Sequence, residues 1–227
     1  MDEKCKSKLF SDAYEGKVDD IIQFIEKDKS ILTAQDSSDR LLIHWAALGG
    51  HTDLVSHLLS SGSPVDPQDD MHMTPLILAS SAGRVDVVRQ LVGAGASVNS
   101  RNVQGHSSLQ YAASKGWKDI VKLLLDEGAE VNIADVRGAR PLHRASSVGH
   151  LPVVAMLLAQ KSVDVNARDA DGNTPLHLSC EEDRGEVAQL LVERGAQLDA
   201  LNKEKQTPLD LASTALAKLL RSLVEKV

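Results

Sequence analysis

Apolar residues recur along this chain in short groups, with the spacing of a helix that buries one face. Residues 54–59 and 120–125 both carry apolar side chains at positions i, i+1, i+4 and i+5, which predicts helices packed against neighbours. A second block, clearest as Thr74-Pro75-Leu76, precedes such helices. The first residues of its copies are 41, 74, 107, 140, 174 and 207, so the steps are 33, 33, 33, 34 and 33 residues. The pattern predicts a tandem array of helix pairs, each burying its apolar side against the next.

Turn-forming residues mark the ends of these predicted helices. Thr at positions 74, 174 and 207 is expected to cap the first helix of its unit, and the Pro that follows suits the first helical position. Gly at positions 50, 83, 116 and 149 is expected to end that helix. Arg140 replaces the capping Thr, Leu41 does the same, and Asp183 replaces the terminal Gly. Each unit begins with a residue suited to a tight turn: Asp36, Asp69, Asn102, Asp135, Asp169 and Asn202.

The repeat length is similar to that of ankyrin repeats, each a turn followed by two helices. This resemblance implies an all-α ankyrin-repeat solenoid of seven helix-pair units, with projecting β-hairpin loops and with N- and C-terminal caps. We expect one domain over residues 1–227, because stacked units share no central core. The expected units are approximately 1–35, 36–68, 69–101, 102–134, 135–168, 169–201 and 202–227.

Composition and charge narrow the classes of function. Aromatic residues make up 3% of the chain and the formal net charge is −7, which disfavours a deep apolar ligand pocket and a nucleic-acid partner. Cys5 and Cys180 lie far apart in the sequence, which suggests a reducing compartment and no disulfide framework. The N-terminal residues lack an apolar signal region, and no apolar run reaches the roughly 18 residues that span a bilayer. We expect a monomer, soluble in the cytoplasm and nucleus, with no membrane partner.

The sequence contains no recognisable catalytic or cofactor motif. Because a Gly-rich phosphate loop, a nucleophile elbow and paired Cys ligands are all missing, we expect no enzymatic activity, cofactor or metal. His44, His143 and His177 recur once per unit and would not converge on one metal ion. We expect each of them to hydrogen-bond a neighbouring turn, and expect the same of His51 and His150.

Charges alternate in sign along the predicted loops and first helices. This alternation favours a protein partner with a complementary pattern, which provides specificity more than affinity. For any single charge, ordinary solvated surface is an equally good interpretation. Trp45 and Tyr111 share one repeated position, where each could anchor a partner or pack between units. Met71 and Met73 could supply adaptable apolar contacts.

Several segments resemble the gankyrin family of proteasome-associated ankyrin-repeat proteins. They are Ala13-Tyr14-Glu15-Gly16-Lys17, Ile43-His44-Trp45-Ala46, Tyr111-Ala112-Ala113-Ser114-Lys115, the stretch 171–178 and Asn202-Lys203-Glu204. The resemblance implies an assembly chaperone of the proteasome regulatory particle. It would hold the C-terminal domain of a base ATPase subunit on its concave face. The alternative is a signalling inhibitor or adaptor for a cyclin-dependent kinase, the retinoblastoma protein or a transcription factor.

The resemblance and the charge pattern together give a set of candidate protein-binding residues. On the resemblance, Asp39, Asp70 and Glu182 would meet basic partner residues, and Arg40, Lys115 and Arg137 would meet acidic ones. The family tends to have an aromatic residue where Met73 stands. The full set is Asp39, Arg40, Trp45, Asp70, Met71, Met73, Tyr111, Lys115, Arg137, Arg140, Arg144, Glu181, Glu182 and Lys203.

Two further features allow other interpretations. Leu178, Cys180 and Glu182 spell the L-x-C-x-E motif that binds the retinoblastoma pocket, and the resemblance implies such an activity. On a helix this motif would have to unfold locally before it could bind in an extended form. Asn99, Asn132 and Asn166 each follow a Val in a loop, where ankyrin asparagines can be hydroxylated, although turn geometry explains them equally well.

Overall fold

The helices of this protein are short and follow one another in pairs. The computed structural model describes residues 3–224, and side chains are described for residues 6–223. Within residues 3–224 there are fourteen α-helices, one 3-10 helix and no strand. The chain divides into two compact units, Met1–Ser108 and Leu109–Val227, and each is described by itself.

Each unit of the fold is built from pairs made of a first and a second helix. The Met1–Ser108 unit contains α1 (Glu3–Glu15) with α2 (Val18–Lys27) and the 3-10 helix η1 (Lys29–Thr33), α3 (Leu42–Gly49) with α4 (Thr52–Ser60), and α5 (Pro75–Ser81) with α6 (Val85–Gly93). The Leu109–Val227 unit contains nearly all of α7 (Ser108–Lys115), with α8 (Lys118–Asp126), α9 (Pro141–Val148), α10 (Leu151–Leu158), α11 (Pro175–Glu181), α12 (Gly185–Glu193), α13 (Pro208–Leu211) and α14 (Thr214–Val224). The predicted all-α arrangement of helix pairs is confirmed.

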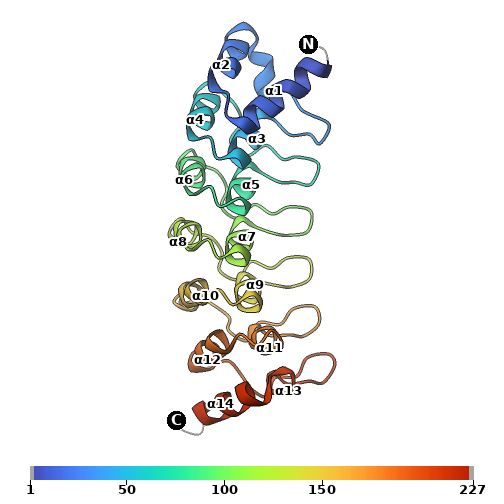
Figure 1. Ribbon diagram of the computed structural model, residues 1–227, viewed down its shortest axis with the longest axis vertical. Coiled ribbons are helices and arrows are strands. Elements are labelled where there is room, and N and C mark those ends of the chain that lie inside the picture. Colours follow the sequence, from blue (N-terminus) through green and yellow to red (C-terminus); the bar gives the residue numbers. More distant parts are fainter. Residues whose placement is uncertain (1–2, 225–227) are drawn as a thin grey trace. The chain divides into compact units, whose positions relative to one another are not determined.

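Loops project from the first helices, on the side away from the second helices (Figure 1). The second helices bury three of the four predicted apolar positions: Leu54, Val55 and Leu58 of α4 are fully buried, whereas Leu59 is half-buried. The corresponding three residues of α8 are fully buried as well. Within residues 3–224, no helix has the length and apolar character needed to cross a membrane.

Each loop is held by the Asp or Asn that begins its repeat. Asp69 Oδ1 accepts hydrogen bonds from the backbone N–H groups of Met71 at 2.9 Å and Met73 at 2.7 Å. The carboxylate or amide oxygens of Asp36, Asn102, Asp135, Asp169 and Asn202 accept the same pair of bonds, from two and four residues further on. The loops are therefore side-chain-stabilised turns, and an antiparallel bridge joins Arg101 to Ser107.

The predicted caps of the first helices are confirmed. Thr74 Oγ1 accepts the N–H of Ile77 at 3.3 Å, and Thr174 and Thr207 accept equivalent bonds. Arg140 makes no such bond, as expected for a residue without a short oxygen-bearing side chain. The ring of His143 still accepts the backbone N–H of Arg140 through Nδ1, at 3.2 Å. The helix start at Arg140 is therefore partly satisfied from inside the helix.

Left-handed residues end the first helices at the predicted positions. Gly50, Gly83, Gly116 and Gly149 all have positive φ, and so does Asp183, with φ of 50°. A side chain on Gly116 would collide with the His150 ring, because a Cβ there would lie 2.7 Å from Cε1 and Nδ1. This glycine is thus required by its conformation and by the close approach of the histidine.

Buried histidines connect one repeat to the next, as predicted. In His44, Nδ1 accepts the N–H of Leu41 at 2.9 Å, so Nε2 carries the proton and donates to the carbonyl of Met73 at 3.1 Å. His143 and His177 donate in the same way to the carbonyls of Asn173 and Gln206, both at 3.1 Å. Each ring thereby ties a first helix to the following loop.

The histidines at the second repeated position also behave as predicted, but they point backward along the chain. His51 Nε2 bonds the carbonyl of Tyr14 at 2.7 Å, and His150 Nε2 bonds the carbonyl of Ser114 at 3.1 Å. Arg84 and Arg184 occupy the same position and reach the carbonyls of Leu48 and Ser147.

Candidate protein-binding surface

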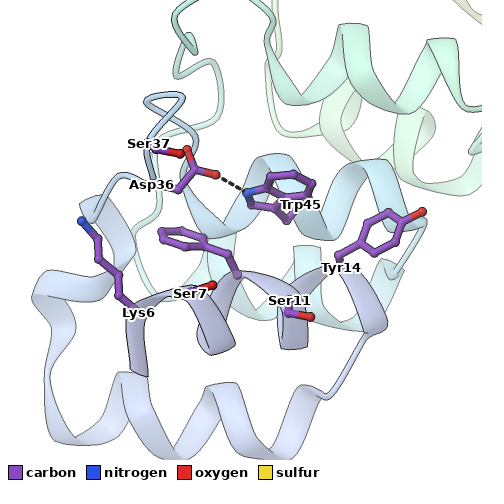
Figure 2. Close-up of a pocket in the computed structure, with 8 residues that line it drawn as sticks. Lys6, Ser7, Ser11, Tyr14, Asp36, Ser37 and Trp45 are labelled. Atoms are coloured by element: carbon purple, nitrogen blue, oxygen red, sulfur yellow. Dashed lines mark hydrogen bonds between the residues drawn. The ribbon is translucent and has the colours of Figure 1, made fainter. Parts of the chain in front are cut away.

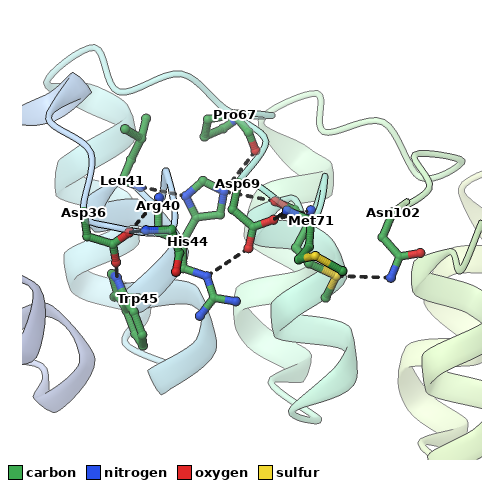
Figure 3. A network of polar contacts seen from close by, with 11 residues as sticks. Asp36, Arg40, Leu41, His44, Trp45, Pro67, Asp69, Met71 and Asn102 are labelled. Carbon is green, nitrogen blue, oxygen red and sulfur yellow. Dashed lines mark hydrogen bonds and ion pairs between the residues drawn. The ribbon is translucent and has the colours of Figure 1, made fainter. Parts of the chain in front are cut away.

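In the Met1–Ser108 unit, the predicted binding residue Trp45 belongs to a polar network on α3 (Figure 3). Its indole N–H donates to Asp36 Oδ2 at 2.8 Å, and the guanidinium of Arg40 lies 5.0 Å from the ring centroid. Arg40 also pairs with the buried carboxylate of Asp69 at 2.9 Å. Trp45 is half-buried and Arg40 has an internal partner, so both residues are held in fixed positions. A fixed aromatic ring beside a cation is a good anchor, since little side-chain entropy is lost on binding.

Two neighbouring loop tips, in the turns that begin at Asp36 and Asp69, carry the exposed members of the predicted set in this unit. Asp39, Asp70 and Met71 are exposed, and Met71 is 44% exposed. Met73 is half-buried, and its sulfur accepts a weak hydrogen bond from the Asn102 amide at 3.5 Å. Met73 therefore supports the loop while Met71 offers the apolar contact.

In the Leu109–Val227 unit, Arg144 takes the place that Trp45 has in the first. Its guanidinium donates to Asp135 Oδ2 at 2.5 Å, nine residues earlier, as the Trp45 indole does to Asp36. The Asp135 side chain is buried, whereas Arg144 stays partly exposed. An aromatic residue and an arginine thus occupy equivalent positions with the same internal partner.

Two hollows in this unit bring several predicted residues together. The larger, of about 360 Å³, is lined by Arg137, Arg144 and Leu178 among others, and the smaller, of about 230 Å³, by Glu181 and Lys203. Asp171 lines both hollows and pairs with Arg137 at 2.7 Å. Basic and acidic groups therefore alternate over one stretch of loops and first helices.

The other predicted residues of this unit lie outside those hollows. Arg140 pairs with Asp164 at 3.0 Å. Glu182 is exposed and reaches Arg184 only at 3.9 Å. Tyr111 is half-buried and Lys115 is exposed, both on α7. Glu182 and Lys115 remain accessible to a partner.

The L-x-C-x-E residues lie at the end of α11. Cys180 is 1% exposed and Leu178 is half-buried. Burial raises the pKa of the Cys180 thiol to about 12, and the Asp183 carboxylate adds to the effect. The thiol is therefore protonated and packed, and binding as an extended segment would require α11 to unravel.

The three buried histidines are neutral structural groups. Burial lowers the pKa of His44, His143 and His177 below its usual value of 6.5, so all three rings are neutral at pH 7. Among the residues with described side chains, no cluster of three or more His, Cys, Asp or Glu could hold a metal ion.

Some contributors to this surface were not predicted. Asp36 and Asp135 orient the residues nine positions later, and Asp171 links the two hollows. The nine-residue spacing from Asp36 to Trp45, and from Asp135 to Arg144, was visible in the sequence. The role of Asp171 depends on the contact between loops, which the spacing does not reveal.

Comparisons with known sequences agree with this repeat structure. Residues 9–102 and 95–169 match the family described as Ankyrin repeats (3 copies), and residues 157–212 match Ankyrin repeats (many copies). The chain belongs to the ankyrin-repeat family. The ankyrin-repeat domain of human ASB11 has the same fold, with a TM-score of 0.85 and 24% identity, and the match covers 94% of this chain and 96% of that one. Ankyrin repeats of this kind are protein-interaction scaffolds, which is the class of function the sequence predicted.

This ankyrin-repeat protein is similar to one proteasome subunit over part of its length. It is 42% identical to rat 26S proteasome non-ATPase regulatory subunit 10 over 75 residues, which are 32% of each chain. The human protein is 43% identical over 75 residues, 32% of this chain and 33% of that one. The match thus spans about a third of these relatives, and over that part the resemblance to gankyrin is confirmed. Protein fem-1 homolog C of Bos taurus is 43% identical over 54 residues, 24% of this chain and 9% of that protein.

Proposed function

We propose that this protein is a non-enzymatic assembly chaperone of the proteasome regulatory particle. It acts as a monomer in the cytoplasm and nucleus and holds the C-terminal domain of a base ATPase subunit against its loops and first helices. The local similarity to 26S proteasome non-ATPase regulatory subunit 10 supports the partner class. Occupying that domain would delay docking of the ATPase on the proteolytic core until the base is complete.

The observation that carries this proposal is the alternation of charge on the loops and first helices. Arg137, Asp171, Glu181 and Lys203 line adjoining hollows. Each exposed charge adds only modestly to the binding free energy. A surface that alternates positive and negative charges nevertheless disfavours partners whose charges do not match it. The partner surface should therefore carry its own alternating pattern, as a helical domain with mixed surface charges would.

The test is a double charge reversal, Asp70→Lys with Glu182→Lys. Both side chains are exposed, and among the described side chains the only ion pair of either is the 3.9 Å contact of Glu182 with Arg184, so the fold should survive. We expect binding to purified ATPase C-terminal domains, measured by calorimetry, to weaken by about tenfold or more and to depend differently on salt.

The matched control is Glu26→Lys with Glu127→Lys. Both residues are exposed, and one lies in each unit, so this double variant makes the same change of charge as the test variant. Glu26 lies on α2, however, and Glu127 lies at the end of α8. Binding should be nearly unchanged. Equal affinity of both double variants, or a cyclin-dependent kinase as the main protein co-purifying with the wild type, would overturn the proposal.

A further inference from the structure

A hollow in the Met1–Ser108 unit lies between α1 and the turn that precedes α3. Its volume is about 700 Å³, within the range of pockets that bind small molecules. Figure 2 shows that the lining side chains come from α1 on one side and from the turn and α3 on the other. They are Lys6, Ser7, Phe10, Ser11, Tyr14, Asp36, Ser37 and Trp45.

One wall of this hollow is aromatic. Trp45 and Tyr14 meet edge to face, with ring centroids 6.1 Å apart, and Tyr14 is 47% exposed. Phe10 lines the hollow from α1 and is otherwise buried. The Trp45 ring is fixed by its bond to Asp36 and by Arg40, so the wall is formed before anything binds. Such a wall suits a bulky apolar side chain.

The polar lining of the hollow includes one ammonium group, that of Lys6, and the hydroxyl of Ser7 beside it. Among the described side chains, neither Lys6 nor Ser7 has a recorded hydrogen bond or ion pair. The one carboxylate in the lining, Asp36, already accepts from the indole of Trp45 and from the N–H groups of Ser38 and Arg40. The oxygens of Asp36 are therefore already used by donors of the protein itself, and the hollow offers a ligand the Lys6 ammonium group and the Ser7 hydroxyl.

The backbone adds another donor at the same place. In the later turns of this unit, the N–H one residue after the first Asp or Asn donates to the preceding loop: Asp70 to Ser38 at 3.0 Å, and Val103 to Met71 at 3.0 Å. Ser37 is the equivalent residue in the first such turn, and no loop of this kind precedes it. No bond from its N–H is recorded among the described residues. By equivalence, this N–H points toward the side where α1 and Lys6 lie.

We propose that this hollow binds a short extended peptide segment of a partner protein, in which an Asp or Glu stands next to a bulky apolar residue. The apolar side chain packs on Trp45 and Tyr14, the carboxylate pairs with Lys6 and Ser7, and a peptide carbonyl accepts from the Ser37 N–H. That last bond would add one more backbone hydrogen bond to those that join neighbouring loops, as a strand added to the edge of a sheet extends its hydrogen bonds. The inference goes beyond the chaperone function, because it uses neither the hollows of the second unit nor a proteasome partner.

The test uses the fluorescence of Trp45 in a Trp117→Phe background, since these are the only two tryptophans. The probes are blocked hexapeptides with an Asp-Phe core, together with Asn-Phe, Lys-Phe and Asp-Ala versions. We expect saturable binding of the Asp-Phe peptide, and binding weaker by about tenfold for each other peptide, because each lacks the charge or the ring.

Variants of the protein provide the second arm. Lys6→Gln should weaken binding of the Asp-Phe peptide by about fivefold or more and leave the Asn-Phe peptide unaffected. Lys8→Gln is the matched control, since Lys8 is exposed on α1 and does not line the hollow. Equal effects of the two substitutions, equal binding of the Asp and Lys peptides, or no saturable change with any peptide would overturn the inference. Binding of 3-phenylpropionate without binding of the peptide would also overturn it, in favour of a small-molecule site.

Discussion

Single residues at the loop tips carry backbone strain that the sequence only partly reveals. Gly105, Gly138 and Gly172 occupy a tip position with positive φ, where glycine has no steric penalty. Lys205 and His72 stand at the same position in other loops, with φ of 61° and 57°. The sequence places glycine at this position in three loops, but it does not reveal that the other residues there keep the same conformation. The neighbouring bonds of the loop decide that.

Replacing Lys205 by Gly should therefore stabilise the protein. A left-handed conformation costs an L-residue about 1–2 kcal/mol, and glycine gives back about 0.5–1 kcal/mol through its more flexible unfolded state. We expect the free energy of unfolding, measured in urea, to rise by about 0.5–1 kcal/mol. Lys203→Gly removes the same charge at a position without positive φ, and it should leave stability unchanged or lower it. A gain in that control alone would contradict the strain argument.

At the scale of elements, the loops are joined by side chains that also explain the Val-Asn pattern. Asn166 donates to the carbonyl of Gly195 at 3.0 Å and accepts from the N–H of Gln197 at 2.9 Å. Asn132 makes the same two bonds to Ser162 and Asp164. Asp66 stands at the same position and can only accept, which it does from Ser97 at 2.8 Å. Hydroxylation of these asparagines stays a prediction, but their amides already have structural partners.

Asn166→Asp should weaken this connection between loops. It keeps the acceptor for Gln197 but places a carboxylate oxygen against the carbonyl of Gly195, so we expect a loss of about 1–2 kcal/mol in the free energy of unfolding. The reciprocal change, Asp66→Asn, supplies the missing donor and should stabilise. Both values come from urea denaturation at pH 7. If Asn166→Asp and Asp66→Asn shift stability in the same direction, the amide is not the connecting group.

For the whole molecule, the parts predictable from sequence are those fixed by local chemistry. Thr74 and Thr174 cap helices because a short hydroxyl side chain reaches the third N–H of the helix, and that rule needs no tertiary information. The candidate site was less predictable. Arg40 and Arg144 carry the expected charges, yet both have buried internal partners that come from the contact of turns and helices. The hollow beside Trp45 needs α1 packed against a turn some 30 residues later, and periodicity does not encode that.

Stability of the whole chain should fall as the pH drops below neutrality, because three histidines are buried as neutral rings. The folded-state pKa values of His44, His143 and His177 are lowered by burial, whereas an unfolded histidine titrates near 6.5. Below about pH 6.5 the unfolded chain therefore binds more protons than the folded one, and the free energy of unfolding decreases. The contribution is fully present above pH 6.5 and is lost as the pH falls toward the folded-state values. The limiting slope is about 1.4 kcal/mol per pH unit for each histidine.

Another repeat of the same chain shows which residue can replace a buried histidine. Gln110 occupies the histidine position of its repeat and donates to the carbonyl of Ala139 at 2.8 Å, so an amide can take the place of the ring. His143→Gln with His177→Gln should keep the helix-to-loop bonds and remove two of the three titrating groups. Urea denaturation between pH 7 and 5.5 should then show a smaller slope than that of the wild type. His57→Gln changes a histidine that lies outside these connections and should retain the full slope. A slope unaltered in the double variant would mean that other groups drive the pH dependence.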